Sequence, residues 1–154
     1  GYRFRRELAE IIVALSDCGD TEEEFHRVAK LLPRMGTEFL PSAHPLCGVA
    51  LSLWLFDTSR TELPGGYVAN ELSPKCPARD CAAFDPDFVL VCRTTLLIRG
   101  LAARLGVNWS LTKAWREHAL ATLRGEPVAG AGGAGKAPRR STPSRLFSPL
   151  LVPL

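Results

Sequence analysis

The residues with the most suggestive chemistry form a glycine-rich run near the C-terminus. Residues 130–137 read Gly-Ala-Gly-Gly-Ala-Gly-Lys-Ala, which matches the phosphate-loop spacing Gly-x-x-x-x-Gly-Lys. A working phosphate loop has a Ser or Thr after the lysine to ligate magnesium, and it connects a strand to a helix. Ala137 occupies the hydroxyl position, and neither flanking element is indicated. We therefore interpret residues 130–137 as a low-complexity linker.

Cysteine and histidine side chains are the candidates for binding zinc. Cys76 and Cys81 lie close together in the sequence, with Cys92 and His118 further along the chain. A structural zinc site needs a second closely spaced pair of ligands, and the remaining histidines stand alone. We predict no metal site and expect the five cysteines to be mostly buried, reduced thiols.

Nucleophilic catalysis would need a Ser or Cys beside a His and an orienting acid. The sequence contains no nucleophile elbow, and His118 falls on a predicted helix beside Trp115, where a surface histidine is the common outcome. Asn108-Trp109-Ser110 has the form of a glycosylation sequon, but Ser110 also stands where a helix cap is expected. We identify no catalytic, cofactor-binding or metal-binding residue in this chain.

The positive charge is concentrated at the C-terminal end. The chain has 19 Lys and Arg against 16 Asp and Glu, a net charge of +3. That excess falls entirely on residues 125–154, so residues 1–124 are neutral overall and lack the basic surface that nucleic-acid binding requires. The basic tail could make weak, salt-sensitive contacts with an anionic membrane surface.

Apolar residues recur at helical spacing along most of residues 1–124, and cap and terminator signals divide them into segments. In three of these segments, the predicted helix caps are Thr21, which forms a capping box with Glu24, Asp85 and Ser110. Residues 45–56 are apolar on nearly all sides and could instead form a buried strand. The pattern predicts an all-α fold of about five helices and no convincing strand, at residues 2–16, 21–36, 45–56, 85–106 and 110–124.

The clearest predicted helix spans residues 85–106. Its apolar residues Leu90, Leu97, Leu101 and Leu105 are separated by steps of seven and four, which return to nearly the same side of a helix. The same spacing places Arg93, Gly100 and Arg104 together on another face. We expect the two arginines to form either an ion-pair surface or an ordinary solvated face.

Two segments show no helical period. Residues 57–84 contain several prolines and glycines and predict a long loop, which would be an insertion in the helical domain. Residues 125–154 are rich in Gly, Ala, Pro and Arg, and we predict a disordered basic tail. Within that tail, Ser141, Thr142 and Ser148 stand in basic or proline-flanked contexts that resemble kinase acceptor sites.

Two stretches together resemble the C-terminal region of the AarF/UbiB atypical kinase-like family, over roughly residues 2–124. The first begins Tyr2-Arg-Phe-Arg-Arg-Glu-Leu-Ala-Glu-Ile-Ile-Val-Ala-Leu and continues through an acidic turn to Gly36. The second runs from Asp85-Pro-Asp-Phe through Arg99-Gly-Leu to Gly106. The order and spacing of these helical, apolar motifs agree with that family.

The resemblance implies that the helices form the C-terminal subdomain of a protein-kinase-like fold that binds ATP and magnesium. It also implies a role in isoprenoid-quinone or lipid metabolism, in a mitochondrion, plastid or bacterium. The family's nucleotide loop, its Lys-x-Gly-Gln element and its catalytic and metal-binding aspartates would all precede Gly1, so no functional residue carries over.

Gly1 stands where a complete chain would have Met, so we expect a longer parent protein. The partner of these helices would then be the N-terminal kinase-like part of the same protein. The alternative is a self-standing helical interaction module whose basic tail binds a partner or a membrane.

Overall fold

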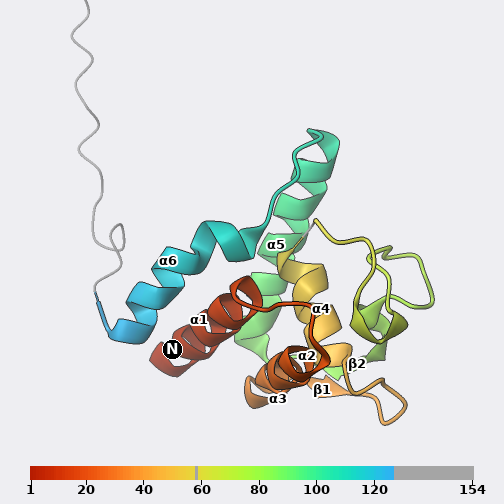
Figure 1. Cartoon of the computed structure of the whole chain (residues 1–154), viewed down its shortest axis with the longest axis horizontal. Coiled ribbons are helices and arrows are strands. Elements are labelled where there is room, and N and C mark those ends of the chain that lie inside the picture. Colours follow the sequence, from red (N-terminus) through yellow and green to blue (C-terminus); the bar gives the residue numbers. More distant parts are fainter. Residues whose placement is uncertain (58, 127–154) are drawn as a thin grey trace, which may run out of the picture.

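The computed structural model describes residues 1–57 and 59–126 (Figure 1). The predicted linker at 130–137 and the kinase acceptor contexts of the tail lie outside this part of the chain. In chain order the elements are α1 (Tyr2–Ser16), α2 (Glu22–Ala29), α3 (Leu31–Arg34), β1 (Glu38–Phe39), α4 (Cys47–Phe56), two 3₁₀ turns (Pro64–Gly66 and Pro77–Asp80), β2 (Cys81–Ala83), α5 (Pro86–Arg104) and α6 (Leu111–Arg124). The described residues are therefore mostly helical, as predicted.

Helix α4 is the centre of the core. All ten of its residues are buried, and the other elements are arranged around it (Figure 1). A helix with no polar side must be covered all round, which agrees with its apolar sequence. The prediction of a helix here, in preference to a buried strand, is confirmed. None of the helices in residues 1–57 and 59–126 is long and apolar enough to cross a membrane.

Helices α1 and α6 lie side by side and bring the two ends of the described chain together (Figure 1). The apolar stripe of α1 is buried at Ile11 and Ile12, and Leu111 and Ala119 of α6 are buried as well. Arg116 of α6 forms an ion pair with Asp17, the residue that caps the C-terminal end of α1. The distance between their charged atoms is 2.9 Å.

The predicted helix at residues 21–36 is divided into α2 and α3. Thr21 caps α2 as expected, since its side chain accepts a hydrogen bond from the backbone N–H of Glu24. Proline has no N–H, so Pro33 cannot donate the helical hydrogen bond to the carbonyl of Ala29. Helix α2 ends at Ala29.

The prediction of no strand is wrong for one small feature. Strands β1 and β2 pair antiparallel, with Glu38 opposite Ala83 and Phe39 opposite Cys81. Strands of two and three residues are too short to carry a readable alternation of apolar and polar residues. Their partners also lie far apart in the sequence, so no hairpin signal was available.

Much of the predicted loop at residues 57–84 packs against the core. Leu63, Tyr67 and Cys76 are buried, and two 3₁₀ turns and β2 interrupt the irregular backbone. The side chain of Trp54 donates to the carbonyl of Ala69 at 3.1 Å, which holds the segment to α4. Residues 57–84 are thus a part of the folded structure despite their lack of periodicity.

Candidate interaction surface on helix α5

Helix α5 has a buried inner side and an outer side with exposed leucines. Its inner side contains the buried residues Phe88, Thr95 and Ala102. Three exposed leucines of the outer side and the C-cap residue Leu105 form what we call the α5 stripe: Leu90, Leu97, Leu101 and Leu105, with exposures of 63%, 76%, 58% and 67%. The C-terminal half of α5 extends beyond the other helices (Figure 1).

The sequence correctly placed the leucines of the α5 stripe on one face but did not show that this face is exposed. The buried residues of the inner side also recur at helical spacing, with steps of seven residues from Phe88 to Thr95 and Ala102. Because both sides fit a helical period, periodicity alone could not tell which one enters the core. An apolar face of this kind that remains exposed is typical of an interaction surface.

Arg93 and Arg104 lie beside the α5 stripe and are both exposed. Within residues 1–57 and 59–126, neither side chain forms a salt bridge. Helix α5 therefore presents an apolar strip with two cationic side chains along its border. Such a surface suits a partner with an apolar groove and acidic groups at its edge.

Arg99 fixes α5 against the rest of the fold, and sequence reasoning did not single it out. Its guanidinium donates to the carbonyl of Trp54 at 2.6 Å and to that of Ala69 at 2.8 Å. It also lies over the indole ring of Trp54, 5.0 Å from the ring centroid. The acceptors are backbone atoms of distant segments, so no residue pattern in the sequence could have indicated this contact.

The N-terminal ends of α5 and α6 are capped by the predicted residues. The carboxylate of Asp85 accepts hydrogen bonds from the backbone N–H groups of Asp87 and Phe88, at 2.8 and 3.3 Å. Ser110 caps α6 by accepting from the N–H of Lys113. These caps set where α5 starts and where α6 starts.

The cysteines and the histidine that were considered as zinc ligands are not brought together as a site. Cys76 is buried, Cys81 and Cys92 are half-buried, and His118 is exposed on α6. Among the described residues, no three His, Cys, Asp or Glu side chains are grouped to hold a metal ion. His118 instead borders a shallow groove between α1 and α6, together with Trp115.

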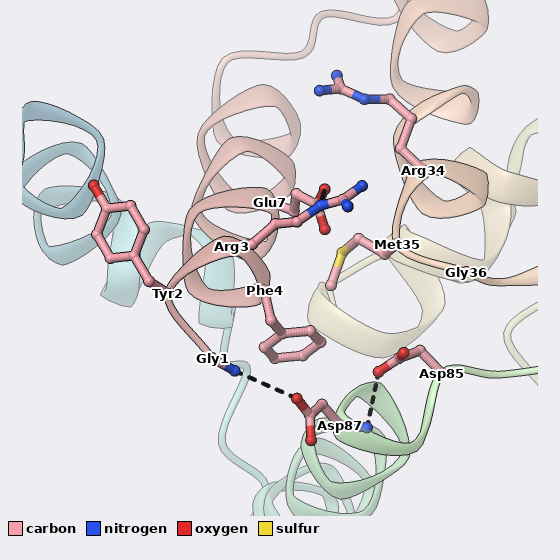
Figure 2. Close-up of a pocket in the computed structure, with 10 residues that line it drawn as sticks. All are labelled: Gly1, Tyr2, Arg3, Phe4, Glu7, Arg34, Met35, Gly36, Asp85 and Asp87. Carbon is pink, nitrogen blue, oxygen red and sulfur yellow. Dashed lines mark hydrogen bonds and ion pairs between the residues drawn. The ribbon is translucent and has the colours of Figure 1, made fainter.

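A larger cavity of about 410 Å³ lies between the start of α1, the end of α3 and the start of α5 (Figure 2). Both of its arginines are paired with glutamates: Arg3 donates to Glu7 at 2.9 Å, and Arg34 lies 3.4 Å from Glu10. Asp85 accepts both capping hydrogen bonds of α5 through one carboxylate oxygen, Oδ1.

Among the described residues, no three His, Cys, Asp or Glu side chains are grouped to hold the magnesium ion that the family resemblance implies, and the resemblance places the ATP and metal sites before Gly1. No family model, curated protein or solved structure matches this chain. The AarF/UbiB resemblance therefore stays a prediction.

Proposed function

We propose that this chain is the C-terminal helical subdomain of an AarF/UbiB-like atypical kinase. In this role it is a structural support, and the ATP-binding active site is carried by another part of the same protein. The parent would act in isoprenoid-quinone or lipid metabolism, in a mitochondrion or a plastid, as the resemblance implies.

The exposed α5 stripe is the observation that carries the proposal. The described residues cover the inner side of α5 and leave the four leucines of the stripe exposed, which is typical of a surface that a partner covers. A missing part of the same polypeptide would supply the second cover. Arg93 and Arg104 would then contact acidic residues at the edge of that interface.

The sequence of the transcript upstream of the Gly1 codon tests this proposal. We expect the reading frame to continue upstream through an alanine-rich nucleotide loop and a metal-binding aspartate in an Asp-Phe-Gly-like triplet. A start codon directly before Gly1 would contradict the proposal and favour the self-standing interaction module. A continuous upstream frame that lacks these kinase elements would also contradict it.

A further inference from the structure

Two cysteine thiols meet where α4 begins. Cys47 is the first residue of α4, and Cys81 is the first residue of β2. Both thiols donate to the same acceptor, the carbonyl oxygen of Pro77, at 3.6 Å from Cys47 and 3.7 Å from Cys81. The fold therefore brings together two thiols that are distant in the sequence.

The surroundings of the two sulfurs make them chemically different. The neighbouring Cys81 thiol lowers the pKa of Cys47, against the opposing effects of burial and of the Asp80 carboxylate. The start of a helix also favours a thiolate. At Cys81, the hydrogen bond with Cys47 and burial both raise the pKa. Cys47 is thus the better nucleophile, and Cys81 keeps its proton.

The polar groups around the pair hold Tyr67 in place. Its hydroxyl accepts a hydrogen bond from the backbone N–H of His44 at 3.1 Å and donates to the carboxylate of Asp80 at 2.5 Å. Asp80 directly precedes Cys81, so the same network positions the second thiol. Both cysteines are therefore held on an ordered frame.

Access to Cys47 is narrow. The residue is 1% exposed, and it borders a cavity of about 350 Å³ that is also lined by Lys30, Phe39 and His44. A cavity of this kind admits a small oxidant more readily than a protein partner. Cys81 is half-buried at the edge of the β1–β2 pair.

We propose that Cys47 and Cys81 form a peroxide-sensitive thiol pair that oxidises to an intramolecular disulfide. The Cys47 thiolate attacks one oxygen of hydrogen peroxide, so that an S–O bond forms and the O–O bond breaks. Hydroxide leaves and takes up a proton to become water. The Cys81 sulfur then attacks the sulfenic acid at Cys47, the S–S bond forms, and a second water leaves with the Cys81 proton. Two thiols are oxidised while one peroxide is reduced to two waters.

The other described cysteines lack this arrangement. Burial raises the pKa of Cys92 to about 12, so its thiol stays protonated. Burial also raises the pKa of Cys18, which donates to the neighbouring carbonyl of Gly19. These thiols serve as internal controls for the selectivity of oxidation. The inference concerns residues within this chain and is independent of the proposed kinase-like parent.

Peptide mapping after oxidation tests the proposal. The reduced chain of 154 residues is treated with hydrogen peroxide, alkylated at acidic pH and digested with trypsin and chymotrypsin, which together separate Cys81 from Cys92. We expect a linked pair of peptides containing Cys47 and Cys81, a loss of two hydrogens from the intact chain, and reversal by dithiothreitol. In Cys81→Ser, dimedone should trap a sulfenic acid at Cys47.

The matched control is Cys92→Ser, which should keep the Cys47–Cys81 link. The proposal is overturned if the wild-type chain shows no such link while peroxide modifies other cysteines. It is also overturned if linkage involving Cys76 or Cys92 is as abundant as the Cys47–Cys81 link. Both of these contradicting outcomes are measured on the wild-type protein, so neither depends on how well a cysteine variant folds.

Discussion

Arg99 shows how much one side chain contributes to the position of α5. Its two hydrogen bonds reach the end of α4 and the packed segment around Ala69, and its guanidinium stacks on Trp54. The carbonyl of Trp54 lies near the C-terminal end of α4, where the helix dipole favours a cation. Arg99 therefore joins three segments of the fold through one charged group.

We predict that Arg99→Met lowers the free energy of unfolding by about 2 kcal/mol, because it removes two charge-assisted hydrogen bonds and a cation–π contact while retaining the apolar stem. The matched control is Arg93→Met on the same helix, where the exposed side chain forms no described ion pair and the change should be below about 0.5 kcal/mol. Urea unfolding followed by circular dichroism measures both. Equal effects of the two substitutions would contradict the anchoring role of Arg99.

The residues that the sequence predicted well act over short distances. Thr21, Asp85 and Ser110 bond to backbone groups two or three residues away, so their roles could be inferred from local spacing. Arg99 and the Cys47–Cys81 pair depend on contacts between distant segments. The sequence identified the cysteines as thiols but could not show which two would meet.

At the scale of elements, α2 and α4 pack at unusually short range where Gly48 meets the end of α2. A Cβ atom built on Gly48 would lie 2.4 Å from the carbonyl oxygen of Ala29. Pro33 has no N–H group to donate to this carbonyl oxygen, and α2 ends at Ala29. The backbone of α4 therefore approaches α2 at its end. The apolar pattern predicted both segments as helices, but it could not predict that their backbones touch.

We predict that Gly48→Ala destabilises the fold by about 1–3 kcal/mol, because the added methyl group collides with backbone atoms that cannot rotate away. Gly100→Ala on α5 is the matched control. A Cβ atom there meets no atom within 4 Å, so alanine should instead stabilise the helix by about 0.5–1 kcal/mol. Thermal and urea unfolding check both signs. A neutral Gly48→Ala would show that α2 and α4 can separate without cost.

At the scale of the whole molecule, α4 and α5 both have strong apolar patterns but differ in how completely they are buried. Helix α4 is covered on all sides, whereas the outer side of α5 is exposed. The sequence predicted apolar faces for both, but only the arrangement of the elements around α4 distinguishes them. The proposed function interprets the exposed side of α5 as an interface with a missing part of the protein.

This interpretation predicts that the isolated chain associates through the α5 stripe. We expect sedimentation velocity to show concentration-dependent self-association and the dye ANS to bind, because four leucines on one side of α5 are exposed to water. Leu97→Glu should reduce both signals and leave the melting temperature nearly unchanged, since Leu97 is 76% exposed. Leu72→Glu is the matched control, because Leu72 is 86% exposed but lies outside the stripe. The interpretation of the α5 stripe as an interface is contradicted if the wild-type chain stays monomeric and binds no ANS. It is also contradicted if the two substitutions have equal effects.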